Sequence, residues 1–376
     1  MILSKKIRLK PTPEQETLLW KSVGTARFIY NWTLNQQDIN YSSGGKFLSD
    51  NVLRKELTQL KKGELIWLNE VSNNVAKQAV KDACNSFKRF FKGQSKFPRY
   101  KSRKRSKPSF YNDTSKLKIK VGQVLIEKIG WIQTSEQVPM DCKYTNPRVS
   151  YDGKYWYLSV GVEQIFEEVE LKDISLGIDV GVKDLAICSD GSVFKNINKT
   201  RTVKKLEKRL RRLQRKVSRK YENNKEGNRF AKTCNIIKIE KQIRLLHRRL
   251  TNIRKNHLHQ TTSAIVKTKP SRIVMEDLNV SGMMKNKHLS KAIAQQGLYE
   301  FRRQIQYKCE KYGIEFIEAD RWYPSSKTCS SCGSIKKDLK LSDRKYICHC
   351  GFELDRDLNA SINLSRYQFS NVTITS

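Results

Sequence analysis

Apolar and polar positions follow two different patterns in the first 170 residues. Residues 1–10 alternate apolar and basic side chains, which predicts a strand with one face in water. Residues 12–15, Thr-Pro-Glu-Gln, supply an N-cap, a first-turn proline and a capping-box partner, and residues 13–95 continue mostly at helical spacing. Residues 109–169 return to short alternating strands between Gly and Pro turns. The pattern predicts a small β-barrel or sandwich that the first strand could join, with a helical insertion.

A second domain is predicted from about Leu171, because strands and helices alternate from there on. Ile174–Asp179 is predicted to be a buried strand that runs into a Gly turn, and Leu185–Cys188 a second strand. Ser271–Glu276 predicts a third strand, which ends in a carboxylate, and a helix from about Ala292 to Tyr312 then leads to a strand at Ile314–Ala319. Such alternation is typical of an α/β domain.

Two long basic helices are predicted between these strands. Residues 201–220 hold eleven Lys or Arg and one Glu, with a single apolar stripe at Leu206, Leu210, Leu213 and Val217. Residues 236–260 show the same combination of many basic residues and a single apolar stripe. One face should pack and the other should face water or a polyanion. A solvated helical hairpin and a nucleic-acid-binding hairpin fit this pattern equally well.

The charge of the chain narrows the possible partners. The sequence has 376 residues, with 74 Lys and Arg against 37 Asp and Glu, which gives a formal net charge of +37. Such self-repulsion is best relieved by a polyanion, so nucleic acid is the expected partner. No apolar run approaches the roughly 18 residues that span a bilayer. We therefore expect a soluble, cytoplasmic protein associated with the prokaryotic nucleoid, and no membrane.

Candidate contacts to nucleic acid come from two segments. Residues 96–107 form a basic linker that contains aromatic residues and is too charged to pack into a core, so it should lie on a phosphate backbone. The first predicted basic helix is the second segment. The candidates are Arg99, Lys101, Arg103, Lys104 and Arg105 in the linker, and Lys204, Lys205, Lys208 and Arg212 in the helix.

Four of the nine cysteines form two closely spaced pairs. Cys329 and Cys332 are separated by two residues, Cys348 and Cys350 by one, and each pair is followed by Gly. Four thiolates in this layout can close a tetrahedral shell around a structural zinc ion. Because the second pair is Cys-x-Cys, His349 remains an alternative to one thiolate. The other five cysteines are scattered and are expected to be idle or buried thiols.

Three acidic residues stand where strands or helices meet turns. Asp179 and Glu276 end predicted strands, and Asp357 lies in the first turn of a predicted helix. Alone, each is equally well a turn residue, a helix-terminal charge or an N-cap. Together they are the ligand types that hold two Mg²⁺ ions about 4 Å apart.

Four ordered motifs resemble a known family. The segments Gly177–Ala186, Val274–Asn279, Tyr323–Gly333 and Asp355–Ala360 are similar to the RuvC motifs and zinc ribbon of the TnpB proteins, transposon-encoded nucleases related to type V CRISPR effectors. The similarity extends over essentially the whole chain. It implies an RNase H-like (RuvC) domain with an inserted zinc ribbon, preceded by a β-barrel, wedge-like domain that carries a helical insertion.

The resemblance also implies domain boundaries. The wedge-like domain would comprise residues 1–12 and 108–170, and the helical recognition domain with its linker residues 13–107. The nuclease domain would comprise residues 171–324 and 352–376, including the basic hairpin 201–260, and the zinc ribbon residues 325–351.

The same resemblance assigns a function and its residues. It implies an RNA-guided DNA endonuclease that uses a guide RNA encoded near its gene and cuts double-stranded DNA beside a short flanking motif. The three catalytic acids fall on Asp179, Glu276 and Asp357, served by two Mg²⁺ ions, and the zinc thiolates on the four paired cysteines. Asp355 is the rival for the third acid; Asp357 is preferred because it directly precedes x-Asn-Ala, as in more distant relatives of this motif. A nuclease-inactive guided repressor and a strand-joining recombinase are the alternative functions.

Overall fold

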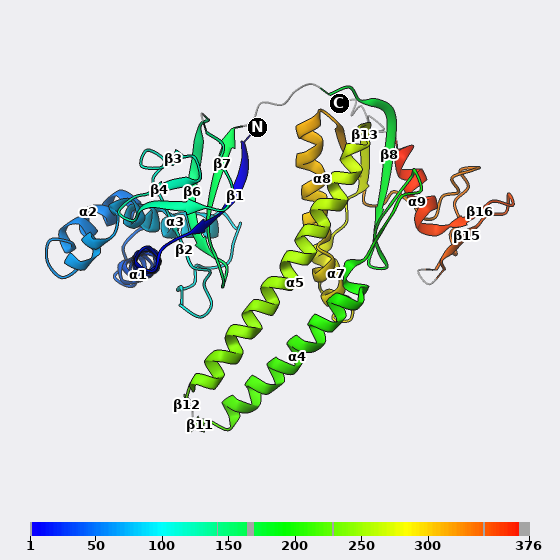
Figure 1. Ribbon diagram of the computed structural model, residues 1–376. Helices are drawn as coiled ribbons and strands as arrows, with labels where there is room; N and C mark the ends of the chain where they lie inside the picture. The colour runs from blue at the N-terminus through cyan, green and yellow to red at the C-terminus, as the bar shows by residue number, and fades with distance from the viewer. Residues whose placement is uncertain (1, 141, 164–168, 228, 341–342, 368–376) are drawn as a thin grey trace. The chain divides into compact units, whose positions relative to one another are not determined.

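The computed structural model describes residues 2–140, 142–163, 169–227, 229–340 and 343–367, and these form two compact units that divide near residue 165 (Figure 1). Each unit has its own hydrophobic core. Among the described residues, no helix is both long enough and apolar enough to cross a membrane.

The N-terminal unit is built on a seven-stranded antiparallel sheet with the order β2-β6-β7-β1-β5-β4-β3. Strand β1 (Ile2–Lys10) pairs along its length with β7 and at its end with β5, which confirms that the first strand joins the later ones. No β2–β3 pairing is found among the described strands, so closure into a barrel stays a prediction. The remaining strands are β2 (Ser109–Tyr111), β3 (Lys118–Lys120), β4 (Gln123–Ile126), β5 (Gly130–Thr134), β6 (Tyr144–Tyr151) and β7 (Trp156–Glu163).

Helices fill the insertion between β1 and β2. Thr12 forms the predicted capping box with Gln15 at the start of α1. Leu19 and Val23 of α1 pack on the sheet, and Ile29, further along α1, contributes to a second core whose buried residues come from the helices. The elements are α1 (Pro13–Ser42), α2 (Asp50–Leu60), a 3-10 turn (Ile66–Glu70) and α3 (Asn73–Phe91).

The C-terminal unit contains a five-stranded mixed sheet with the order β10-β9-β8-β13-β14. The three strands β8, β13 and β14 are parallel, and β9 and β10 extend the sheet in antiparallel pairings. The carboxyl ends of β8, β13 and β14 therefore meet at one edge of the sheet. The strands are β8 (Lys172–Val180), β9 (Asp184–Cys188), β10 (Val193–Lys195), β13 (Pro270–Glu276) and β14 (Glu315–Ala319).

Helices cover both faces of this sheet. On one face α5 (Cys234–Lys267) and α8 (Leu298–Tyr312) pack against side chains such as Ile178 and Met275. On the other face α9 (Arg356–Ser365) packs against Val274. The predicted helix 292–312 is divided at Gly297, whose φ of 72° ends α7 (Ser290–Gln296) before α8 begins. A short helix, α6 (Val280–Met283), follows β13.

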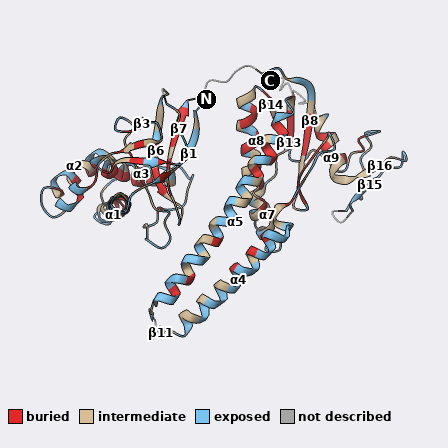
Figure 2. Ribbon diagram, viewed as in Figure 1, coloured by how far each residue is buried: buried red, intermediate tan, exposed pale blue. Residues whose placement is uncertain are grey.

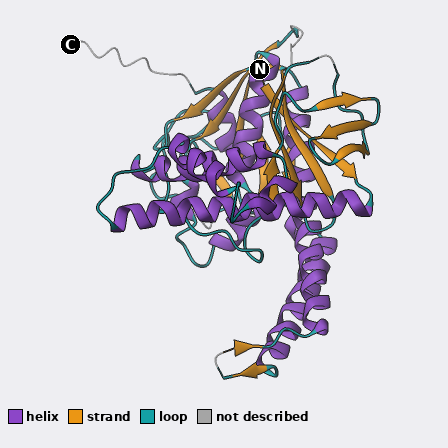
Figure 3. Ribbon diagram, turned by 90° about the vertical axis from the view of Figure 1, so that its left-hand side faces the viewer, coloured by secondary structure: helices purple, strands orange, loops and turns teal. Residues whose placement is uncertain are grey.

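The predicted basic hairpin is present and projects from the sheet (Figure 1). Helix α4 (Arg201–Glu222) follows a short 3-10 turn (Ile197–Lys199) and packs its Leu206 and Leu210 against Leu246 and Leu250 of α5. Two short strands, β11 (Lys225–Glu226) and β12 (Arg229–Phe230), close the tip (Figure 3). Much of the hairpin surface is exposed, as Figure 2 shows. Helix α5 runs from residue 234 to 267, beyond the predicted 236–260.

Helix α9 lies unusually close to strand β8. A Cβ atom built on Gly177 would stand 1.9 Å from the carbonyl oxygen of Ser361 and 2.4 Å from the backbone nitrogen of Ser365. Backbone atoms of the helix cannot give way as a flexible side chain does. Gly177 is therefore required for α9 to approach the strand.

We expect Gly177→Ala to destabilise the C-terminal unit by about 1–3 kcal/mol or more, because the added methyl group overlaps the α9 backbone. Gly181→Ala is the matched control from the same motif, since the nearest atom to its Cβ would be 3.5 Å away. Thermal unfolding of both variants measures the difference. Equal melting temperatures would show that the close approach is not needed.

Candidate active site and metal centre

Two of the predicted acids lie on neighbouring parallel strands. In the β8–β13 register Ile178 faces Met275, so the next residues, Asp179 and Glu276, stand opposite each other at the strand ends. Side chains alternate along a strand, so Asp179 shares the face of Gly177, the face that α9 covers. Glu276 shares the face of Val274, which also packs toward α9. Both carboxylates therefore lie on the same side of the sheet.

The third predicted acid comes from α9 itself. Asp357 lies in the first turn of that helix, one turn before Ser361, whose carbonyl contacts Gly177. Asp355 is the N-cap, and its Oδ1 accepts hydrogen bonds from the backbone N–H groups of Asp357 at 3.0 Å and Leu358 at 3.2 Å. The interpretation of Asp357 as a plain N-cap is therefore wrong, because Asp355 has that role.

The electrostatics of Asp179 reflect how close the acids are. Burial raises the pKa of Asp179 well above its usual range, and the negative charges of Glu276 and Asp357 raise it further. Arg356 opposes this effect, and its guanidinium lies 3.3 Å from the Asp357 carboxylate. The hydroxyl of Ser325 donates a hydrogen bond to Glu276. The three acids thus place negative charge close to Asp179, and a bound cation would offset it.

Among the described residues, the three carboxylates are not gathered into the ligand shell of a single metal ion. Within the described parts of the chain, the four paired cysteines are the one group of at least three candidate ligands whose atoms all lie within 4.8 Å of one another. A pair of metal ions about 4 Å apart needs a wider set of ligands than a single ion does. Hard carboxylate oxygens are the donors that Mg²⁺ prefers, so the donor set fits magnesium.

The four cysteines converge as the sequence predicts. The sulfur atoms of Cys329 and Cys350 are 3.9 Å apart, and those of Cys332 and Cys348 are 3.6 Å apart. A tetrahedral zinc ion with Zn–S bonds of about 2.3 Å requires sulfur atoms about 3.8 Å apart. His349 is not a member of the cluster. The geometry fits zinc held by the four thiols, and it does not support His349 as a ligand.

Local turns shape this metal centre. Gly333 and Gly351 have positive φ values of 75° and 84°, and each N–H donates to the carbonyl of the cysteine at the start of its turn. Strands β15 (Lys345–Ile347) and β16 (Glu353–Asp355) form the hairpin beside it. Hydrogen bonding to Ser334 lowers the pKa of Cys332 to about 6, which favours the thiolate form that binds metal.

Helix α9 links the metal centre to the carboxylates through two asparagines that the sequence analysis missed. The buried Asn359 amide donates to the Thr328 carbonyl at 2.7 Å and accepts from the Ser330 N–H. Asn363 donates to the carbonyls of Ser325 and Thr328, both at 2.7 Å. Their spacing of four residues on the buried face of a helix was the available clue.

Comparison with known proteins places the chain in a family. Family models described as "Helix-turn-helix domain", "Probable transposase" and "Cas12f1-like, TNB domain" match residues 1–46, 157–287 and 299–364. The chain is 33% identical to a "Putative RNA-guided DNA endonuclease" of Streptomyces pristinaespiralis, with 96% of this chain and 87% of that protein aligned. The chain belongs to the TnpB (OrfB) family of RNA-guided DNA endonucleases.

Two further similarities agree with the TnpB assignment. The InsQ protein of Escherichia coli (strain K12) is 31% identical over 96% of this chain and 90% of its own length. A solved Cas12f1–sgRNA–target DNA complex contains a chain of similar fold, with a TM-score of 0.59, 16% identity, and coverage of 94% of this chain and 82% of that one. The segment matched as "Helix-turn-helix domain" forms strand β1 and helix α1 in this structure.

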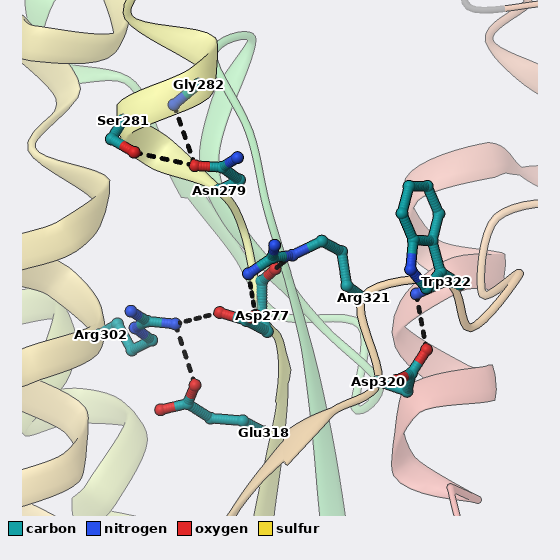
Figure 4. Close-up of polar contacts among 9 residues, drawn as sticks. All are labelled: Asp277, Asn279, Ser281, Gly282, Arg302, Glu318, Asp320, Arg321 and Trp322. Carbon is teal, nitrogen blue, oxygen red and sulfur yellow. Dashed lines mark hydrogen bonds and ion pairs between the residues drawn. The ribbon is translucent and has the colours of Figure 1, made fainter.

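A second acid of the TnpB motif has a different environment from its neighbour. Asp277, the residue after Glu276, accepts hydrogen bonds from Arg302 at 2.9 Å and from Arg321, and these hold its pKa below its usual range (Figure 4). Arg302 also contacts Glu318 at 3.0 Å. Asp277 is thus paired with two arginines, whereas Glu276 accepts a hydrogen bond from Ser325.

The residues predicted to contact nucleic acid differ in how exposed they are. Lys101 lies over the Tyr30 ring, 3.6 Å from its centroid, and its backbone bonds to Asn31, so part of the linker packs on α1. The other linker candidates, Arg99, Arg103, Lys104 and Arg105, and the helix candidates, Lys204, Lys205, Lys208 and Arg212, are exposed. Exposure leaves their contacts with nucleic acid a prediction.

We expect the purified protein to contain one tightly held zinc ion per chain. The double variant Cys329→Ser/Cys332→Ser should lose it and unfold locally, because a closed four-thiolate shell is structural. Elemental analysis and limited proteolysis measure both effects. Cys234→Ser, at an exposed cysteine outside the cluster, and His349→Ala should keep the metal. Zinc-free parent protein, or a double variant that folds and cleaves normally, would disprove the assignment.

The charge cluster predicts a pH-dependent effect of Asp179→Asn. The pKa of Asp179 is higher in the folded than in the unfolded chain, so the parent loses stability as pH rises from about 4 through the folded value. Asn carries no charge, so the variant should melt several degrees above the parent at pH 8 and close to it at pH 4. Melting curves in magnesium-free buffer test this. A difference independent of pH would contradict the repulsion.

Proposed function

We propose that this chain is an RNA-guided DNA endonuclease of a transposable element, which cleaves double-stranded DNA beside a short flanking motif. The strand register carries the proposal, because it sets Asp179 and Glu276 side by side on the face of the sheet that α9 covers, and the charges of Glu276 and Asp357 both act on Asp179. Carboxylates at the carboxyl ends of parallel strands, completed by the first turn of a helix, support an RNase H-like (RuvC) nuclease.

Each carboxylate has a distinct part in the proposed reaction. Asp179, on which the charges of both other acids act, would hold both Mg²⁺ ions, and Glu276 and Asp357 would each contribute to holding one of them. When bound, the ions supply water activation and neutralise charge on the leaving 3′ oxygen. Ser325 orients the Glu276 carboxylate through its hydrogen bond. Hydrolysis would leave a 5′-phosphate and a 3′-hydroxyl.

The positive charge of the chain supports the guided part of the function. An RNA–DNA heteroduplex is held through its A-form backbone while base pairing reads the sequence, which requires basic surface spread over several segments. The net charge of +37 and the exposed basic face of the α4–α5 hairpin meet this requirement. The S. pristinaespiralis and E. coli relatives are both named as putative RNA-guided DNA endonucleases, which supports a guided function.

The domain roles are part of the proposal. Residues 1–12 and 108–170 would act as the wedge-like domain, and residues 13–107 as the recognition domain. Residues 171–324 and 352–376 would form the nuclease, and residues 325–351 a zinc ribbon that binds target nucleic acid.

A recombinase is the second candidate, because one matching family model is described as "Probable transposase". The chemistry of the acids would serve strand transfer as well as hydrolysis. Product analysis separates the two, since strand transfer yields joined molecules and hydrolysis yields only ends. A nuclease-inactive repressor is disfavoured by the presence of all three acids.

Removing one acid should separate cutting from binding. In Asp357→Asn the ribonucleoprotein should still bind its guide-matched duplex, while cleavage falls by several orders of magnitude. Asp179→Asn and Glu276→Gln should behave alike, and double variants should be hardly worse than single ones, because residues that act as a unit are non-additive. Single-turnover cleavage and gel-shift affinity measure the two effects.

Asp355→Asn is the matched control for that experiment, because Asn retains N-capping ability and leaves Asp357 in place. It should retain substantial cleavage. If Asp355→Asn abolishes cleavage and Asp357→Asn does not, the third ligand is Asp355. If all of these variants cut as fast as the parent, the nuclease assignment fails.

DNA binding should depend on salt through α4. Replacing Lys204, Lys205, Lys208 and Arg212 by Ala should flatten the slope of log affinity against log salt, since each lost phosphate contact lowers it by about 0.7–0.9. Exchanging Lys for Arg, and Arg for Lys, at the same four positions keeps the charge and should keep the slope. An unchanged slope in the Ala variant would identify this face as merely solvated.

A further inference from the structure

The side chain of Trp322 is unusually exposed. Its relative exposure is 85%, the highest of the large apolar side chains in the described part of the chain. A single exposed aromatic residue is common on protein surfaces and needs no explanation by itself. The position and the rigidity of the segment that carries Trp322 are what make it informative.

The segment is fastened on both sides of Trp322 to the end of β13. Arg321, immediately before it, is paired with Asp277, and Ser325, three residues after it, donates to Glu276. The segment from residue 321 to 325 therefore spans two consecutive acids, one of which is a proposed magnesium ligand. Trp322 lies only three residues after Ala319, which pairs with Glu276, so the Cα atoms of Trp322 and Ala319 are at most about 11 Å apart.

Further hydrogen bonds hold the backbone around Trp322, while its indole ring remains exposed to water. The Trp322 N–H donates to Asp320 Oδ1 at 2.8 Å, and the Tyr323 N–H to the Asp320 carbonyl at 3.0 Å. The Tyr323 hydroxyl donates to the Asn363 carbonyl of α9 at 3.2 Å. Figure 4 shows the indole standing apart from the Arg321–Asp277–Arg302 contacts. A backbone held by these hydrogen bonds thus presents an apolar ring to water on the segment that is bonded to the end of β13.

We infer that Trp322 is a stacking platform for a nucleobase of the DNA strand whose phosphate lies at the carboxylates. This inference rests on the proposed nuclease function. A phosphodiester bound there would bring its neighbouring bases to the edge of the sheet, and an indole face accepts any base, which suits a guided enzyme that must cut many sequences. Stacking on a preordered ring would hold the strand in line for attack at little entropic cost.

Single-turnover cleavage of a guide-matched duplex by the intact ribonucleoprotein tests the inference, with an abasic nucleotide moved along each strand in turn. Trp322→Ala should cut the unmodified duplex about tenfold more slowly than the parent. In the parent, an abasic site at one position should cause a similar loss. The Trp322→Ala variant should be insensitive to that same position, because the partner of the base is already missing.

Controls separate this role from others. Trp322→Phe should recover most of the rate, and Tyr299→Ala, at a 61% exposed aromatic residue of α8, should match the parent. The melting temperature of Trp322→Ala should equal that of the parent, since the ring packs on little. Parent-like cleavage by Trp322→Ala, or losses that simply add with every abasic position, would overturn the stacking role. Cleavage by Asp179→Asn would instead refute the nuclease function itself.

Discussion

The close approach of α9 to β8 at Gly177 is the contact on which the rest of the site depends. Because a Cβ atom there would meet the helix backbone at 1.9 Å, only glycine lets the helix lie against the strand. One turn before the contact, the helix carries Asp357, and two residues after Gly177 the strand carries Asp179. The same helix holds the cysteine-rich segment through Asn359 and Asn363. A single packing contact therefore joins the carboxylate cluster to the zinc centre.

Two pairs of neighbouring acids differ in their surroundings. Asp277 is paired with two arginines, whereas the adjacent Glu276 stands opposite the half-buried Asp179. Asp355 caps α9, whereas Asp357 in the following turn adds to the charge around Asp179. Asp277 and Asp355 thus have structural partners, whereas Glu276 and Asp357, although they contact Ser325 and Arg356, place their charges near Asp179. The acids that remain concentrate negative charge on a chain whose net charge is +37, an arrangement that destabilises the free protein and favours bound cations.

The sequence predicted the elements whose patterns are local. The capping box at Thr12, the basic hairpin and the paired cysteines were all recognisable from spacing alone, and the structure confirms them. The sequence alone could not predict contacts between segments that are distant along the chain. The division of the helix at Gly297, the asparagine bonds to Thr328 and the pairing of Asp277 depend on tertiary packing. The identity of Asp355 as the N-cap also required the helix start to be located within one residue.

Crystallography of the full-length protein with Mn²⁺ in place of Mg²⁺ tests the central claim most directly. Anomalous scattering locates manganese independently of any assumption about its ligands. The account predicts two peaks about 4 Å apart, bridged by Asp179 and completed by Glu276 and Asp357, with Asp355 bound only to the backbone of α9. Manganese bound elsewhere, or coordinated by Asp355 in place of Asp357, would contradict it.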